Sequence, residues 1–185
     1  MTRHILLTGL PGVGKTTIIK QLAHSLATHQ PDGFFTQEIR EDGIRKGFEL
    51  VTFDGRRQLL SHVNIPGHHR VGRYGVDLAG FEKLLETLDL RHSPSQLVIL
   101  DEIGKMECLS QRFIEEVKAL LDSSKMLIAT VTLKGGGFPA KVKSRPDCRV
   151  VTVNLNNRST LAATLLPEIA TILSSHKEGP HAASS

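Results

Sequence analysis

Apolar residues along this chain alternate between two spacings, and the alternation predicts strands separated by helices. Short, nearly continuous apolar runs are typical of parallel strands buried on both faces, and they occupy residues 3–8, 96–102, 126–131 and 149–153. Apolar residues three and four positions apart predict helices with one buried face, and they occupy residues 16–29, 81–88, 113–121 and 161–173. This order of elements predicts a three-layer α/β fold with a mainly parallel sheet.

Residues 34–62 have a different pattern, made of short β-type segments. These segments, residues 34–40, 47–53 and 59–60, are separated by Asp42-Gly43 and Asp54-Gly55. Asp-Gly between alternating runs is a hairpin signal. We therefore expect an added antiparallel hairpin region beside the parallel sheet.

Turn and cap residues set the expected boundaries of the elements. Asp77 and Ser110 are candidate N-caps, and Pro167 is expected to break the last helix into two pieces. Residues 62–77 and the glycine-rich residues 132–139 are expected to be flexible loops, followed by a short helical turn at 140–144. The 185 residues are expected to form one domain over 1–175 and a disordered polar tail over 176–185.

The segment directly after the first apolar run has the spacing of a phosphate-binding loop: Gly, four residues, then Gly-Lys-Thr. Its glycines let several backbone N–H groups converge on one anion, and the positive end of the next helix points to the same place. Lys15 is expected to contact the β- and γ-phosphates of a nucleotide, and the Thr16 hydroxyl a Mg²⁺ ion. The predicted nucleotide-binding residues here are Gly9, Leu10, Pro11, Gly12, Val13, Gly14, Lys15, Thr16 and Thr17.

The apolar run at residues 96–100 ends in two acids, Asp101 and Glu102. A buried strand that ends in this way delivers a carboxylate to the crevice where open α/β sheets bind ligands. Asp101 is therefore the predicted Walker-B acid, which holds Mg²⁺ directly or through water. Glu102 is the predicted catalytic base that orients or deprotonates the water attacking the γ-phosphate.

Four further residues are weaker candidates. Lys105 lies three residues past Glu102 and is the candidate catalytic cation that neutralises charge on the departing phosphate, with a surface lysine as the alternative. Glu107 is expected to hold Lys105 by an ion pair. Asn157 and Arg158 follow the last strand and are candidates for base or ribose contact, while helix capping is the alternative for Asn157.

Composition limits the classes of partner. The net charge of +4 suits a polyanionic ligand, but no run of five basic residues occurs, so nucleic acid is not supported. No stretch of about 18 apolar residues occurs, and residues 1–15 lack the order of a signal peptide, so we expect a cytoplasmic protein without membrane contact. Cys108 and Cys148 are expected to be free thiols, and the protein is expected to be a monomer.

One motif links the chain to a known family. The residues Asp101-Glu102-Ile103-Gly104-Lys105-Met106-Glu107, together with segment 9–17, resemble the small P-loop nucleoside-triphosphatase family to which human cancer-related nucleoside-triphosphatase belongs. Similar segments run from residue 3 to residue 175 and include Gly33-Phe34, Glu38-Ile39-Arg40, Gly47-Phe48, Val71-Gly72, Tyr74, Val76-Asp77 and Asn157-Arg158. The resemblance implies a P-loop NTPase fold and slow hydrolysis of several nucleoside triphosphates to the diphosphate, with little base selectivity.

Two other functions remain open on the sequence. A small nucleotide or nucleoside kinase has the same fold, but such enzymes usually carry several arginines in a lid, and residues 134–143 contain none. A nucleotide-dependent binding switch for RNA or protein is the third interpretation, since fold alone does not decide function. No Asn-Lys-x-Asp motif is present, which argues against a strict GTPase.

Overall fold

The computed structural model describes residues 2–175, so the tail predicted at 176–185 lies outside the described residues. Within residues 2–175, one mixed sheet has nine strands in the order β5-β6-β4-β3-β2-β7-β8-β1-β9. The strands are β1 (His4–Thr8), β2 (Asp32–Glu41), β3 (Ile44–Thr52), β4 (Arg57–His62), β5 (Arg70–Val71), β6 (Tyr74–Val76), β7 (Leu97–Ile103), β8 (Met126–Val131) and β9 (Cys148–Thr152). The helices are α1 (Lys15–Ser25), α2 (Leu78–Leu88), α3 (Gln111–Asp122), α4 (Gly137–Lys143) and α5 (Leu161–Ser175), with 3₁₀ turns η1 (Ala27–His29) and η2 (Glu107–Leu109).

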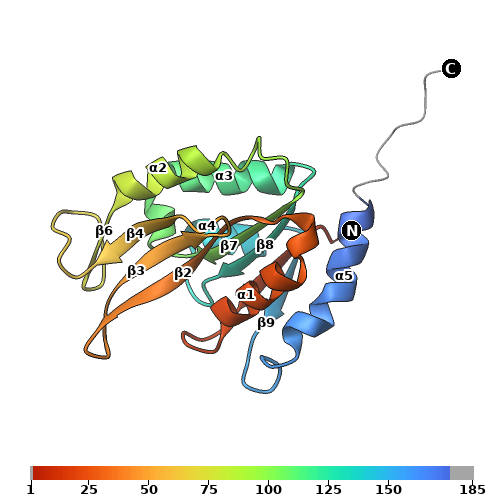
Figure 1. The fold of residues 1–185 in the computed structure, drawn as a ribbon, viewed down its shortest axis with the longest axis horizontal. Helices are drawn as coiled ribbons and strands as arrows, with labels where there is room; N and C mark the ends of the chain where they lie inside the picture. Colours follow the sequence, from red (N-terminus) through yellow and green to blue (C-terminus); the bar gives the residue numbers. More distant parts are fainter. Residues whose placement is uncertain (1, 176–185) are drawn as a thin grey trace.

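The parallel part of the sheet runs from β2 to β9. The pairs β2 with β7, β7 with β8, β8 with β1 and β1 with β9 are all parallel. Helices α1 and α5 cover one face of the sheet and α2 and α3 the other, and each helix layer packs on its own buried apolar cluster (Figure 1). This arrangement confirms the predicted three-layer α/β fold with a mainly parallel sheet.

The antiparallel part is the predicted meander of β2, β3 and β4. Its register places Phe34 opposite Thr52 and Val51 opposite Arg57. β2 belongs to both parts, because its first residues, 32–34, pair in parallel with β7 while residues 34–41 pair antiparallel with β3. Gly33 makes this junction possible: it has φ +119°, and a Cβ there would lie 2.1 Å from the carbonyl oxygen of Ile99.

Three buried phenylalanines tie β2 to the helices above it. The ring of Phe34 packs edge-on against Phe81 of α2, with centroids 6.1 Å apart, and Phe81 lies 5.4 Å from Phe113 of α3. Each ring is fully buried, and each removes roughly 150–250 Å² from water. This cluster fixes β2, and therefore Thr36 farther along it, against β7.

Residues 62–77 are not the flexible loop that the sequence predicted, because β5 and β6 form a hairpin and β6 pairs with β4. Tyr74 is buried, and its hydroxyl accepts a hydrogen bond from Arg45 at 3.0 Å. The glycines that suggested a loop have a packing role instead. A Cβ on Gly75 would lie 2.1 Å from the carbonyl oxygen of Ile65, so the hairpin needs glycine to close.

The prediction at Pro167 was also wrong, because α5 is one helix with this proline inside it. Proline removes one backbone donor from the helix. Leu165 before it and Ile169 after it are both buried in the cluster that α5 shares with α1, and this packing holds the two turns in line. The glycine-rich loop is shorter than expected, since α4 begins at Gly137 rather than near Ala140.

Several smaller expectations are confirmed. Asp77 caps α2 by accepting from the Gly80 N–H at 3.0 Å, and Ser110 caps α3 by accepting from the Phe113 N–H at 3.1 Å. Both cysteines are free. No helix within residues 2–175 has the length and apolar character needed to cross a membrane.

Candidate functional site

The candidate site lies at the carboxyl ends of β1, β7 and β8. The glycine loop, residues 9–14, connects β1 to α1, and Gly12 and Gly14 have φ of +74° and +112°. A Cβ on Gly9 would lie 2.6 Å from the carbonyl oxygen of Val153, so only glycine lets the loop pass this close to the end of β9. Such a loop at a helix N-terminus is suited to an anion, because its free N–H groups and the helix dipole point the same way.

The two residues that open α1 lie at the mouth of this loop. The Lys15 ammonium donates to the carbonyl oxygens of Gly9 and Leu10 at 3.1 and 3.2 Å. The Thr16 hydroxyl donates to Oδ2 of Asp101 at 2.6 Å, which joins two residues that lie far apart in the sequence. Thr17 is exposed on the next position of the helix. The structure therefore brings Lys15, Thr16 and Asp101 together.

Asp101 is almost fully buried, with 3% of its surface exposed, and it accepts from several donors. Thr130 of β8 donates to Oδ1 at 2.6 Å, and the N–H of Thr36 on β2 lies 3.4 Å from Oδ2. The Thr36 hydroxyl also donates to the Asp101 carbonyl oxygen. Sequence reasoning missed both threonines. The available signal was a single hydroxyl residue on each neighbouring strand: Thr36 lies just beyond the part of β2 that pairs with β7, and Thr130 lies next to the end of β8.

Glu102, the next residue, is partly buried beside the same cluster. Its burial raises the pKa of its carboxyl above the usual value, the positive charge of Lys15 lowers it, and the negative charge of Asp101 raises it further. A carboxyl tuned in this way is a stronger base than a solvated one. The charge of Lys15 therefore acts on Glu102, as expected if both residues belong to one site.

Lys105 and Glu107 follow β7, but they do not form the predicted ion pair. No salt bridge of Lys105 occurs within 4.0 Å in residues 2–175, and its side chain is exposed. Glu107 is buried and turns toward Glu102 instead: a Cβ on Gly104 would lie 3.0 Å from Oε2 of Glu107 and 3.3 Å from Cδ of Glu102. The chain folds back through η2, which directs the acid inward and leaves the lysine at the surface.

A cavity of about 230 Å³ opens beside these residues, and we call it the cavity beyond Glu102. Glu102, Lys105 and Glu107 line one side of it, together with Thr132 after β8. Thr36, Phe48, Leu60 and Val71 come from the antiparallel part of the sheet. Burial and the nearby Glu102 raise the pKa of the Glu107 carboxyl to about 8. No residue of the glycine loop lines this cavity.

The loop after β9 approaches the glycine loop from the other side. The Cδ of Arg158 lies 3.8 Å from where a Cβ on Gly14 would be, and no carboxylate of residues 2–175 lies in ion-pair distance of its guanidinium. Asn157 is already engaged: Oδ1 accepts from the Asn154 N–H and Nδ2 donates to the Thr152 carbonyl, both at 2.9 Å. Its side chain thus closes the loop rather than capping α5.

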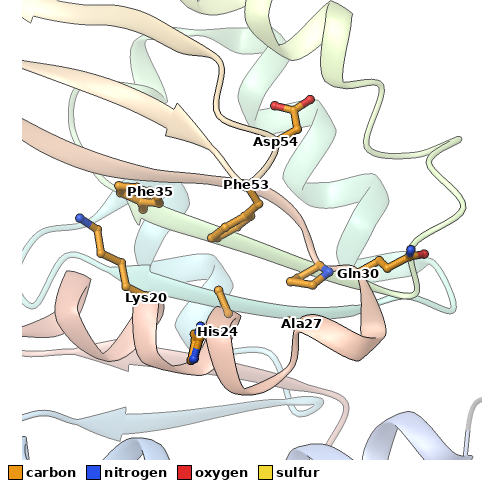
Figure 2. A pocket seen from close by; sticks show the side chains of 9 residues that line it. Lys20, His24, Ala27, Gln30, Phe35, Phe53 and Asp54 are labelled. Carbon is orange, nitrogen blue, oxygen red and sulfur yellow. The ribbon is translucent and has the colours of Figure 1, made fainter.

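A second cavity, about 480 Å³, lies between α1 and the sheet, away from this cluster. Figure 2 shows Lys20, His24 and Ala27 on one side of it and Phe35 and Phe53 on the other. The Lys20 ammonium lies 4.1 Å from the centroid of the Phe35 ring, and Phe35 and Phe53 pack 6.0 Å apart. None of the residues predicted from sequence lines this cavity, so the chemistry is concentrated at the glycine loop and Asp101.

Comparison with known proteins agrees with this geometry. A family model described as NTPase matches residues 4–166. Nucleoside-triphosphatase THEP1 of Thermotoga sp. (strain RQ2) is 42% identical over 163 residues, which cover 88% of this chain and 92% of the relative. Human cancer-related nucleoside-triphosphatase is 39% identical over 194 residues, which cover 96% of this chain and 100% of the relative.

Solved structures agree as well. The crystal structure of THEP1 from the hyperthermophile Aquifex aeolicus has a TM-score of 0.80 at 28% identity, covering 89% of this chain and 98% of that one. The solution structure of a human cancer-related nucleoside triphosphatase has a TM-score of 0.75 at 38% identity, covering 94% of this chain and 98% of that one. With its family model and its relatives matched over most of their length, this chain belongs to the NTPase family.

Proposed function

We propose that this chain hydrolyses ATP, GTP, CTP and UTP to the nucleoside diphosphate and phosphate, with Mg²⁺ and with little selectivity for the base. Its family membership supports hydrolysis of nucleoside triphosphates. The observation that carries the proposal is the 2.6 Å bond between the Thr16 hydroxyl and Asp101. It joins the start of α1 to the acid at the end of β7, the two positions that share a metal ion in P-loop enzymes.

The glycine loop is the proposed site for the β- and γ-phosphates. Its backbone N–H groups and the N-terminus of α1 offer hydrogen-bond donors and a partial positive charge, which suit a phosphate group. The Lys15 ammonium, which donates to the carbonyls of Gly9 and Leu10, is within reach of the same space. We expect it to exchange these neutral acceptors for phosphate oxygens, because a charged acceptor makes the stronger bond.

The donor atoms beside the loop suit Mg²⁺. A hydroxyl and a carboxylate are hard oxygen ligands, and Mg²⁺ in such sites takes its other ligands from water and substrate phosphates. Thr16 and Asp101 would hold the ion, while the bonds from Thr130 and Thr36 keep the Asp101 carboxylate in place. When bound, the ion neutralises negative charge on the phosphates.

Glu102 is the proposed general base. Because burial raises the pKa of its carboxyl, it accepts a proton from the attacking water more readily than a solvated glutamate. Lys105 lies on the wall of the cavity beyond Glu102. It is the proposed cation that neutralises charge developing on the departing phosphate. Arg158, beside Gly14, is proposed to contact phosphate or ribose, which every nucleoside triphosphate carries.

The first test is phosphate release from ATP, GTP, CTP and UTP with Mg²⁺, comparing the intact chain with Glu102→Gln. We expect all four to be hydrolysed by the intact chain. Glu102→Gln keeps the shape of the side chain but removes the base, so turnover is expected to fall by about 10²-fold or more while nucleotide binding is retained.

The matched control is Glu115→Gln, which makes the same change at an exposed position on α3. It is expected to keep the turnover of the intact chain. An intact chain that binds nucleotide but releases no phosphate would contradict the hydrolase. Equal turnover in the Glu102→Gln and Glu115→Gln variants would show that Glu102 is not the general base.

A further inference from the structure

We propose that the cavity beyond Glu102 binds a small uncharged alcohol with an apolar body and that the chain transfers the γ-phosphoryl group to its hydroxyl. The proposal rests on the proposed function, because it uses the same phosphate site and the same base. It adds a second substrate site and a second activity, phosphoryl transfer. The cavity carries the argument through its place along the sheet, its volume and its lining.

The place of the cavity follows from the strand order. The glycine loop follows β1, and the next strands along the sheet are β8, β7, β2, β3 and β4. The cavity is lined by Thr132 after β8, Glu102 of β7, Thr36 of β2, Phe48 of β3 and Leu60 of β4. Thr132 and Glu102 thus mark the end of the cavity that is nearer to the glycine loop along the sheet. A molecule held in the cavity can place its hydroxyl at this end, beside the proposed base.

The volume exceeds what hydrolysis uses. At about 30 Å³ for each water molecule in the liquid, about 230 Å³ corresponds to roughly eight waters, whereas hydrolysis consumes one. The same volume is below the roughly 300–1,000 Å³ of sites for drug-sized ligands. The cavity therefore fits a small molecule.

The lining indicates the chemical class of that molecule. Phe48, Leu60 and Val71 give an apolar wall, and Thr36 and Thr132 offer hydroxyl groups. The Glu102 carboxylate and the Lys105 ammonium balance each other in charge, so the wall offers no spare cation to an anion and suits an uncharged molecule. With its pKa near 8, the Glu107 carboxyl is largely protonated at neutral pH and can donate a hydrogen bond to an alcohol oxygen.

Two segments that the hydrolase leaves without a role border this cavity. Val71 belongs to the β5–β6 hairpin. Lys105 and Thr132 also line a neighbouring cavity of about 300 Å³, whose other wall is the glycine-rich segment Gly135–Gly137. A site for a second substrate would give both segments a role.

The transfer step is balanced without any further reactant. The hydroxyl oxygen of the alcohol forms a bond to the γ-phosphorus, and the bond from that phosphorus to the bridging oxygen breaks. The hydroxyl proton passes to the Glu102 carboxylate, and the nucleoside diphosphate leaves. The products are a phosphomonoester and the diphosphate, and hydrolysis is the same step with water in place of the alcohol.

The test uses ATP labelled at the γ-phosphate with Mg²⁺ and the intact chain, in the presence of benzyl alcohol or cyclohexylmethanol. We expect label in the phosphomonoester. If alcohol and water reacted equally well, the ratio of ester to inorganic phosphate would equal the ratio of their concentrations, which we call the concentration ratio. A bound alcohol is expected to raise the measured ratio about tenfold or more above it. The anionic 4-(hydroxymethyl)benzoate is expected to stay at the concentration ratio. Val71→Trp, which fills the cavity, is expected to lower the ester ratio about tenfold, while Val150→Trp on the edge strand β9 keeps it.

The outcomes separate the two proposals. Normal phosphate release with ester only at the concentration ratio for both neutral alcohols would overturn the acceptor site and leave the hydrolase intact. An alcohol that slows phosphate release without receiving label would overturn the transfer as well. Ester formation without phosphate release would support the acceptor site and contradict the hydrolase, and the absence of both products would contradict both.

Discussion

The parallel and antiparallel parts of the sheet place their charged side chains in different ways. At the carboxyl edge of the parallel part, Asp101 is buried and its carboxylate accepts from threonines on α1 and β8. In the antiparallel part, charged side chains are exposed and pair with each other, as Glu38 does with Arg40 and Arg45. Exposed pairs are screened by water and contribute roughly 0–1 kcal/mol each.

This contrast assigns different roles to the two parts. The parallel part holds a carboxylate in one orientation, which is the requirement for binding a metal ion and phosphates. The antiparallel part contributes its apolar face instead, through Phe48, Leu60 and Val71 on the cavity beyond Glu102. Lys105, Glu107 and Gly33 lie at or near the boundary, and substitutions there test whether the division is real.

The largest effect is expected for Lys105→Ala. If Lys105 neutralises charge that develops on the departing phosphate, turnover is expected to fall by about 10²–10³-fold while nucleotide affinity changes little. Steady-state kinetics with a separate binding titration measure both quantities. Lys141→Ala removes an exposed lysine on α4 as the control. A loss of affinity with unchanged turnover would show that Lys105 contacts the phosphates in the ground state only.

The second prediction concerns the pH dependence of stability. Burial, the nearby Glu102 and then Asp101 raise the pKa of Glu107 to about 8 in the folded protein, from an ordinary 4.5. Between these values the folded state keeps a proton that the unfolded state loses, so this group makes stability fall as pH rises from about 4.5 to about 8. Glu107→Gln keeps the hydrogen-bonding shape but does not titrate. Its stability relative to the wild type is therefore expected to increase by up to about 4 kcal/mol across this range.

Denaturant unfolding of both proteins at pH 5, 6, 7 and 8 measures this difference. Glu86→Gln on α2 serves as the control, because Glu86 is exposed. The unfolding free energy of this variant is expected to follow that of the wild type at every pH. Parallel curves for Glu107→Gln and the wild type would mean that Glu107 is ionised in the folded protein.

The third prediction compares two glycines with positive φ. Gly33, at the junction of the two parts, and Gly43, at the tip of the β2–β3 hairpin, have φ of +119° and +76°. A Cβ on Gly33 would lie 2.1 Å from the Ile99 carbonyl oxygen, whereas nothing lies within 4 Å of one on Gly43. Gly33→Ala is expected to cost about 2–3 kcal/mol of unfolding free energy and Gly43→Ala about 1 kcal/mol, the strain of φ alone. Equal costs in thermal or denaturant unfolding would mean that β2 and β7 can separate at this point.

The smallest effect is expected at the cavity shown in Figure 2. Lys20→Ala removes the contact between its ammonium and the Phe35 ring, at 4.1 Å, and is expected to cost about 0.5 kcal/mol of stability without changing turnover. Lys118→Ala is the matched control, because its ammonium lies 6.0 Å from the Phe138 ring. A clear loss of turnover in Lys20→Ala alone would give this second cavity a part in the reaction.

The elements of the site could be predicted because their signals are local. The glycine loop needs only its own glycines and the helix that follows, and its eight-residue spacing is contiguous in the sequence. Asp101 and Glu102 end an apolar run, which predicts a buried strand and the edge at which it ends. The caps at Asp77 and Ser110 are likewise decided within four residues of the chain.

Only the tertiary structure decided which elements lie side by side. Thr36 and Thr130 hold Asp101 because β2 and β8 flank β7, and the order of strands in a sheet follows from the packing of the whole core. Packing of the buried face of α5 also carried this helix through Pro167, against the local preference of proline. The sequence by itself determined the loop, the strands and the acids, since these depend on periodicity and backbone stereochemistry. Partners distant in sequence, including Glu107 beside Glu102 and the cavity next to them, depend on long-range contacts that no spacing along the chain records.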